Sequence, residues 1–93
     1  MKRKSYASVW DAIEDDPATA ANMKLRSALM IALSNHIEAE GLNQNQAAKL
    51  LGVTQPRVSD LSRGKITLFG LDTLINMVAA AGLQIEVHVA KTA

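Results

Sequence analysis

Apolar side chains recur at helical intervals along most of the chain. The longest such stretch covers residues 18–40, where they lie three, four or seven positions apart and share one face of a helix. These side chains are Met23, Met30, Leu33 and Ile37. Asp16 followed by Pro17 is typical of an N-cap and a first helical residue, and Gly41 is typical of a helix end. The pattern predicts a long helix with one buried stripe.

Three shorter helices are predicted after the long one, each followed by a glycine that suits a helix end. Their ranges are Gln44–Leu51, Gln55–Ser62 and residues 71–81. Asn43 and Thr54 directly precede the first two, and we expect their side chains to cap them. The third helix is expected to bury one face, formed by Leu71, Leu74, Ile75 and Val78.

The two ends of the chain follow other patterns. Residues 1–7 are polar and are expected to form a flexible N-terminus. Ser8 is expected to cap a short helix over the acidic segment that follows it. Near the other end, apolar and polar residues alternate over residues 84–89, which predicts a half-buried C-terminal β-strand. Its apolar members are Ile85, Val87 and Val89.

This strand requires a partner, because a lone strand leaves its backbone N–H and C=O groups without hydrogen bonds. Within the chain only residues 3–7 are available, and they are short and polar. The same strand of a second copy is a better match, since its apolar residues would then face their own counterparts. We therefore expect a homodimer, joined either through this strand or through packing of the helices over residues 71–81.

The composition fits one small helical domain over residues 1–93. Of these residues 48% are hydrophobic and only 3% aromatic, so an aliphatic core and a mainly α fold are expected. The chain has no cysteine, which excludes disulfides and thiolate metal sites. No apolar run approaches the ~20 residues of a membrane span, and no signal-peptide core follows the basic start. A soluble protein of the cytoplasm is expected, without a membrane partner.

Charge is distributed unevenly, although the net charge is only +1. Residues 8–41 carry a net charge of −4, whereas residues 42–68 carry +3. A basic middle beside acidic flanks is typical of a domain that presents one face to phosphates. The same distribution is also compatible with a merely solvated surface.

The segment QNQAAKLLGVTQPRVSDLSRG, which begins at Gln44, has the spacing of a DNA-binding helix-turn-helix. Ala48 is expected where the two helices come closest. Gly52 falls in the turn, where a positive φ is unfavourable for a residue with a Cβ. Apolar residues occupy the positions that face the core, namely Leu51, Val53, Val58 and Leu61. Double-stranded DNA, an operator, is therefore the expected partner.

Most of the chain resembles a known family. The segments SVWDAIEDD, ANMKLRSALMIAL, GLNQNQAAKLLGVTQPRVSDLSRGKI and LDTLINMVAAAGLQIEV are similar to Xre/Cro-type helix-turn-helix regulators, specifically to HigA-type antitoxins. The resemblance implies a lambda-repressor-like helical bundle, to which the alternating pattern adds one β-strand. It also implies a transcriptional repressor that autoregulates a toxin–antitoxin operon and binds a basic RNase-type toxin. One departure is Gly70, where a serine would be a better N-cap.

The predicted DNA-binding surface lies on and around the second helix of the motif. Gln55 is expected to contact an adenine edge and Arg57 a guanine, since both side chains can form bidentate hydrogen bonds. The resemblance implies that Gln44 donates to a phosphate and braces Gln55. Phosphate contacts are expected from Thr54, Ser59, Arg63, Lys65 and Thr67, and Pro56 and Asp60 complete the surface. Simpler roles remain open, because Gln55 could cap its own helix and Arg57 could pair with Asp60.

Two alternatives to an autoregulating antitoxin remain open. The protein could act mainly by neutralising a toxin, since the acidic segment around Trp10 and Ile13 suits a basic partner, or it could be a free-standing phage-type repressor. Catalysis is not expected, because no motif links His36 or His88 to a nucleophile or a metal-ligand cluster. For the same reason neither a cofactor nor a metal is expected.

Overall fold

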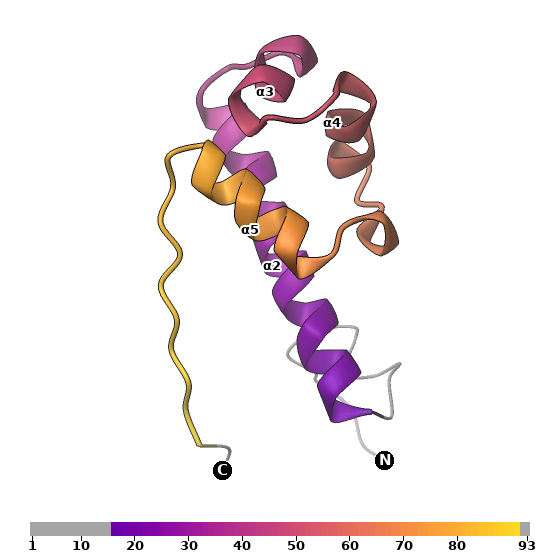
Figure 1. Ribbon diagram of the computed structural model, residues 1–93, viewed down its shortest axis with the longest axis vertical. Helices are drawn as coiled ribbons and strands as arrows, with labels where there is room; N and C mark the ends of the chain where they lie inside the picture. Colours follow the sequence, from indigo (N-terminus) through magenta and orange to yellow (C-terminus); the bar gives the residue numbers. More distant parts are fainter. Residues whose placement is uncertain (1–15, 92–93) are drawn as a thin grey trace.

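The computed structural model describes residues 16–91, which form a small bundle of helices followed by an extended segment (Figure 1). The elements are α2 (Pro17–Ala39), α3 (Gln44–Leu51), α4 (Gln55–Ser62), the 3-10 helix η1 (Ile66–Leu68) and α5 (Leu71–Ala80). The mainly α prediction is confirmed, and each helix lies within one residue of its expected bounds. The flexible N-terminus expected over residues 1–7 and the short helix expected from Ser8 lie outside the described residues.

The start of α2 follows from its N-cap. The Asp16 carboxylate accepts hydrogen bonds from the Ala18 backbone N–H at 3.2 Å and from the Thr19 hydroxyl at 2.6 Å. Both bonds favour the ionised form, the one from Thr19 more strongly, and they hold the pKa of Asp16 below its usual value of 3.8. Pro17 follows at the first helical position, where its missing N–H costs nothing. The predicted cap is confirmed.

The helices pack in two pairs (Figure 1). α5 lies along the long helix α2, and α3 packs against α4 across a short turn. α3 also contacts α5, and η1 contacts α2, so that the second pair is fastened to the first at both ends. The pair α3–α4 therefore lies at one end of the long helix α2 (Figure 1).

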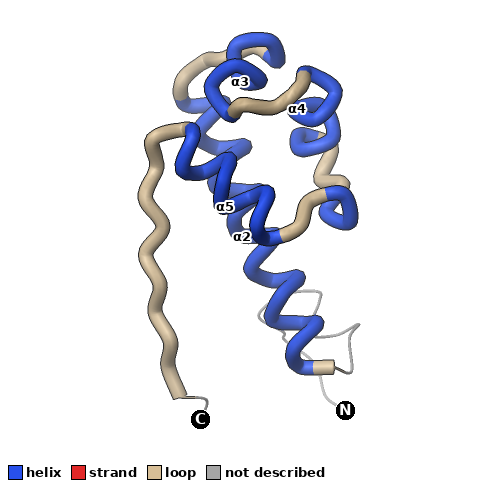
Figure 2. The backbone as a smooth tube through the Cα atoms, in the orientation of Figure 1, coloured by secondary structure: helices blue, strands red, loops and turns tan. Residues whose placement is uncertain are grey.

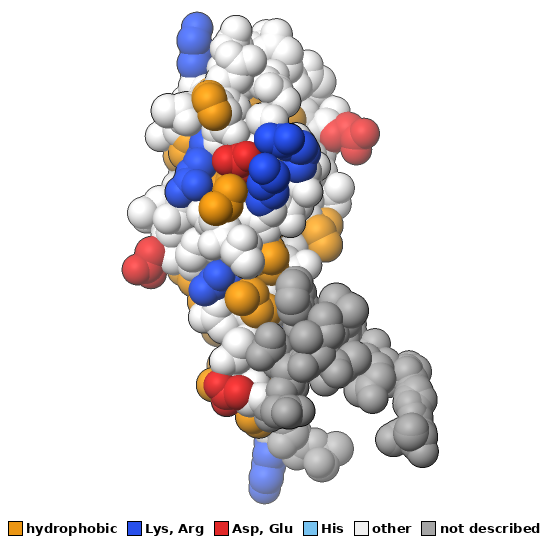
Figure 3. Space-filling view, turned by 90° about the vertical axis from the view of Figure 1, so that its right-hand side faces the viewer, with side chains coloured by type: hydrophobic (Ala, Val, Ile, Leu, Met, Phe, Trp, Pro, Cys, Tyr) orange, Lys and Arg blue, Asp and Glu red, His pale blue; other side chains and the backbone are white. Residues whose placement is uncertain are grey.

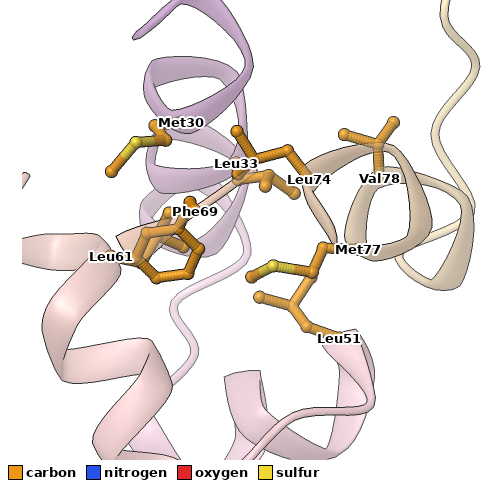
Figure 4. Close-up of a cluster of buried hydrophobic side chains, with 8 residues drawn as sticks. All are labelled: Met30, Leu33, Leu51, Leu61, Phe69, Leu74, Met77 and Val78. Atoms are coloured by element: carbon orange, nitrogen blue, oxygen red, sulfur yellow. The ribbon is translucent and has the colours of Figure 1, made fainter. Parts of the chain in front are cut away.

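The main core lies where α2, α3, α4 and α5 meet Phe69, the residue that follows η1 (Figure 4). Phe69, Leu33 and Leu74 are fully buried, and Met77 is 1% exposed. The remaining members of this cluster are Met30, Leu51, Leu61 and Val78. Burial of one large apolar side chain contributes roughly 1.5–3 kcal/mol. The cluster therefore fixes the position of α4 relative to α2 and α5.

The buried face of α5 differs from the predicted one at Ile75. Leu74 and Val78 are buried as expected, but Ile75 is 43% exposed and Met77 is buried instead. The prediction for Ile75 is wrong because α5 contacts both α2 and α3. Leu74, Met77 and Val78 are buried on one side of α5, and Ile75 is turned away from that side by about 100°, the rotation between successive helical residues.

The predicted β-strand over residues 84–89 is not present in the structure. The chain is extended there, but residues 16–91 contain no strand (Figure 2). Val87 and Val89 are 82% and 88% exposed, so the expected half-burial is also wrong for them. The physical reason is that a strand is defined by a hydrogen-bonded neighbour about 4.8 Å away. The described residues offer no such neighbour to this segment.

Candidate nucleic-acid interface

A reciprocal cap starts α3. The Gln46 backbone N–H donates to Asn43 Oδ1 at 2.8 Å, and the Asn43 backbone N–H donates to Gln46 Oε1 at 2.9 Å. This capping box confirms the predicted role of Asn43, and it occupies the exposed Gln46 side chain in an intramolecular hydrogen bond. Gln44 and Asn45, which lie between the two capping residues, are exposed. The first turn of α3 is therefore rigid and still offers free polar side chains.

The turn between α3 and α4 depends on Gly52. Its φ of 69° and ψ of 32° place it in the left-handed region, as predicted. A residue with a Cβ loses roughly 1–2 kcal/mol in that region. A Cβ built at Gly52 would meet no atom within 4 Å, so the constraint comes from the backbone and not from crowding. The Val53 N–H then donates to the Ala48 carbonyl at 3.0 Å, which closes α3.

Small side chains hold the two helices close together. Ala47 is fully buried, Ala48 is 8% exposed and Val58 is 3% exposed, and these three form one cluster. Ile37, Leu42 and Val53 surround the cluster. The predicted place of Ala48 at the helix contact is confirmed. Its neighbour Ala47 is buried even more completely, which the sequence analysis did not foresee.

The first turn of α4 leaves the Thr54 side chain unused. Thr54 occupies the N-cap position, but its side chain forms no capping hydrogen bond, which corrects the sequence prediction. A capping hydroxyl usually accepts from the second or third helical N–H. The second residue is Pro56, which has no N–H, and the Arg57 N–H donates to the Thr54 carbonyl at 3.1 Å instead. The Thr54 hydroxyl is therefore exposed and free to bind a ligand.

The remaining side chains of α4 divide into an inner and an outer set. Val58 and Leu61 face the core and are 3% and 2% exposed. Gln55 and Pro56 are exposed, and Ser59 is half-buried. The helix α4 therefore packs on the core through its apolar side, and its N-terminal turn is accessible to a partner.

A family model described as a helix-turn-helix domain matches residues 12–90, a range that includes α2 to α5. The chain belongs to this helix-turn-helix domain family. In such motifs the second helix, termed the recognition helix, enters the major groove of DNA, and α4 occupies the position of that helix in this chain. No curated protein matches the chain.

Arg57 is the predicted site residue whose surroundings differ most from expectation. Its guanidinium lies 4.9 Å from the centroid of the Phe69 ring, and the residue is half-buried. A cation held over an aromatic ring is stabilised by about 0.5–1 kcal/mol at an exposed site and by more when desolvated. Arg57 does not pair with Asp60 in this structure, so that simpler role is wrong. The side chain links the recognition helix to the core residue Phe69.

Asp60 instead joins two cations at the C-terminal end of α4. Its Oδ1 lies 3.5 Å from Arg63 Nη2 and 3.8 Å from Lys65 Nζ. The Asp60 side chain is 22% exposed, whereas those of Arg63 and Lys65 are 60% and 47% exposed. Pairs of this kind contribute little to folding stability, about 0–1 kcal/mol. The pairs place the two cations beside the recognition helix, where Figure 3 shows Lys and Arg side chains gathered around one acidic side chain.

Gln44 and Gln55 are both exposed, and no hydrogen bond joins their side chains. Gln44 lies at the edge of a groove between α2 and α4, beside Ile37 and Val58. The bracing of Gln55 by Gln44 therefore stays a prediction. Thr67, in η1, is exposed and follows Lys65, so the structure places both near the end of the recognition helix.

Residues 16–91 contain no cluster of three or more His, Cys, Asp or Glu side chains arranged to hold a metal ion. None of the helices in this part of the chain combines the length and apolar character needed to cross a membrane.

Phe69 is the residue whose part in the site the sequence analysis missed. It lies twelve positions after Arg57, beyond the three- and four-residue spacings that predict contacts within a helix. The available signal was weak: Phe69 is the only phenylalanine of the chain and follows the recognition helix closely.

Proposed function

We propose that this protein is a sequence-specific DNA-binding transcriptional regulator that represses from an operator bound by α4. The observation that carries the proposal is the rigid pair α3–α4, closed by Gly52 and by the Ala47–Ala48–Val58 cluster, with the first turn of α4 exposed. Specific readout requires a helix whose side chains are held in a fixed register against the base edges. Gly52 and the Ala47–Ala48–Val58 cluster hold the backbone of α4 in one position against α3.

Gln55 is the residue that we propose reads a base. It is the first residue of α4, and its exposed amide can both donate and accept, as an adenine edge requires in the major groove. Arg57 has the chemistry to contact a guanine, but its guanidinium must first leave the Phe69 ring. Gln55 is therefore proposed as the principal determinant of sequence preference, with Arg57 second.

Phosphate contacts are proposed for the residues at the two ends of α4. Thr54 has an unused hydroxyl at the N-terminal end, and the cations Arg63 and Lys65 lie at the C-terminal end. Such contacts fix the position of a protein on DNA without reading its sequence. We expect Lys65→Ala to weaken binding to all sequences alike and to reduce the salt dependence, d log K/d log[salt], by about one.

Selection of binding sites from a random DNA pool tests the proposed function. Wild-type protein is expected to enrich one sequence, and Gln55→Ala is expected to lose the preference at one position and to cost about 1–3 kcal/mol at the selected site. Asn76→Ala is the matched control, since Asn76 is an exposed amide on α5, away from the motif. Enrichment of no sequence by the wild type, or the same sequence by Gln55→Ala, would contradict the proposal.

We further propose that the regulator is an antitoxin that binds a basic toxin through its acidic N-terminal third. The support is the resemblance to HigA-type antitoxins and the net charge of −4 over residues 8–41. Deletion of residues 1–15, which retains the Asp16 cap of α2, is expected to abolish capture of the toxin encoded next to this gene and to preserve DNA binding. Equal toxin capture by the shortened chain, or a neighbouring frame that encodes no basic protein, would contradict this role.

A further inference from the structure

The guanidinium of Arg57 belongs to α4 but rests on a residue outside that helix. Its carbon Cζ lies 4.9 Å from the centroid of the Phe69 ring. Successive helical residues are turned by about 100°, so Arg57 projects about 40° from the buried Leu61 and about 160° from the exposed Gln55. Arg57 therefore leaves α4 on the flank of its buried side, whereas Gln55 projects from the opposite flank.

The Phe69 ring is a fixed support for this guanidinium. The ring is fully buried and packs in the main core with Leu61 and Leu74 (Figure 4). The Phe69 backbone N–H donates to the Ile66 carbonyl at 3.1 Å, which fixes the chain directly after η1. A close-packed core leaves such a ring little room to shift. When the guanidinium of Arg57 moves toward a ligand, the ring cannot follow it, and the contact is lost.

No acidic side chain among the described residues holds Arg57 in this position. Asp60, one turn further along α4, is paired with Arg63 and Lys65 instead. The attraction of a cation for an aromatic face changes an equilibrium by roughly two- to fivefold at an exposed site. A bidentate contact with a base discriminates by roughly 5- to 150-fold. The ring contact is thus sufficient to hold Arg57 in the free protein, but it is weaker than a good contact with guanine.

We infer that Phe69 determines how strongly Arg57 selects guanine, because its ring holds the guanidinium away from the base edges until a guanine replaces the ring contact. The inference rests on the proposed function and adds to it a positioning residue that touches no base itself. At a site without guanine, Arg57 stays on the ring, and the affinity does not depend on this contact. At a site with guanine, the ring competes with the base and lowers the preference for guanine by roughly two- to fivefold.

Fluorine labelling tests the contact directly. The chain contains one phenylalanine, so a fluorinated analogue supplied during expression replaces Phe69 alone. A single para-fluorine on the ring reports its surroundings by fluorine NMR. In the free protein, we expect Arg57→Gln to shift this signal. Addition of the duplex selected by the wild type is expected to move the wild-type signal toward that of Arg57→Gln, because the guanidinium then leaves the ring.

Binding measurements test the effect on specificity. Trifluorophenylalanine weakens the attraction of the ring face for a cation and nearly retains the shape of the ring. The selected duplex is compared with one in which adenine replaces the guanine whose selection depends on Arg57. With the trifluorinated ring at Phe69, we expect the affinity for the guanine duplex to rise two- to fivefold and the affinity for the adenine duplex to stay the same.

Arg57→Gln is the matched background for this measurement. A trifluorinated ring is slightly larger than the natural one and can disturb the core by itself. In Arg57→Gln any such disturbance remains, but the cation is absent, so the comparison of the four proteins isolates the contribution of the Phe69–Arg57 contact. We expect the trifluorinated ring to change neither affinity in this background.

Several results would overturn the inference. These are a fluorine signal that Arg57→Gln does not shift, a signal that the selected duplex does not shift, and equal effects of the trifluorinated ring in the wild type and in Arg57→Gln. The proposed function fails separately. Loss of a base preference in Gln55→Ala, with none lost in Arg57→Gln, would reject the role of Phe69 and retain specific DNA binding, whereas a wild type that enriches no sequence would reject both.

Discussion

Gln55 and Arg57 lie two positions apart on α4, but their surroundings differ. Gln55 is exposed on the first turn, whereas the Arg57 guanidinium lies over the buried Phe69 ring. The sequence identified both as residues with base-reading chemistry, because the side-chain type determines which hydrogen bonds are available. It could not predict where the Arg57 side chain rests, since that depends on a contact across twelve positions of chain.

The ion pairs of Asp60 lead to a prediction about DNA affinity. Its carboxylate holds Arg63 and Lys65 at 3.5 and 3.8 Å, so Asp60→Asn would release both cations to bind phosphates. We expect the affinity for non-specific duplex DNA to rise several-fold and the salt dependence, d log K/d log[salt], to become steeper by about one. Fluorescence anisotropy over a range of salt concentrations measures both quantities.

Asp72→Asn is the matched control for that experiment. Asp72 is exposed in the first turn of α5, and its substitution changes the net charge by the same amount. If the two variants bind DNA with the same affinity and salt dependence, the ion pairs of Asp60 do not restrain the cations, and our interpretation of this cluster is wrong.

At the scale of the elements, most of the fold could be predicted from local chemistry. Asp16, Asn43 and the glycines that follow the helices fixed the helix bounds to within one residue. The failures came from neighbours in space. Ile75 is exposed because the side of α5 that packs in the core is centred on Leu74, Met77 and Val78. Thr54 does not cap because Pro56 lacks an N–H. Tertiary packing therefore overrode the helical burial pattern at Ile75, and a neighbouring proline overrode the preference of threonine for the N-cap at Thr54.

Gly52 carries the most specific prediction about an element. Because its φ is 69° and a Cβ would meet nothing within 4 Å, we expect Gly52→Ala to lower the free energy of unfolding by about 1–2 kcal/mol. Gly52→Asn should cost less, since asparagine tolerates the left-handed region better than alanine does. Urea denaturation followed by circular dichroism gives both values, and equal losses would show that the backbone conformation is not the cause.

The N-cap of α2 predicts a dependence of stability on pH. Hydrogen bonds from Thr19 and Ala18 depress the pKa of Asp16 in the folded state below its usual value of 3.8. A carboxyl group whose folded-state pKa is depressed stabilises the fold above its unfolded pKa, and this stabilisation is lost as the pH falls through the folded value. Thr19→Val is expected to bring the Asp16 pKa closer to 3.8. Carbon NMR of the Asp16 carboxyl measures the pKa, and an unchanged value would refute the assigned cause.

At the scale of the whole molecule, the predicted C-terminal strand could not be decided from a single chain. Alternation over residues 84–89 indicated a strand, and the segment is extended, but a strand needs a hydrogen-bonded neighbour that the described residues do not supply. The motif, by contrast, is local: its two helices and turn occupy consecutive residues and pack on a core that the same pattern encodes. The helix-turn-helix was therefore located correctly in the chain, whereas the side-chain contacts within it required the structure.

The central claim is that the first turn of α4 contacts DNA bases, and an NMR titration tests it most directly. Isotope-labelled protein is titrated with the duplex obtained by selection, and the amide shifts are followed for each residue. The largest changes are expected at Gln55 and Arg57, smaller changes at Arg63 and Lys65, and none at Ile75 and Asn76 on α5. Changes concentrated on α5, with α4 unaffected, would contradict it.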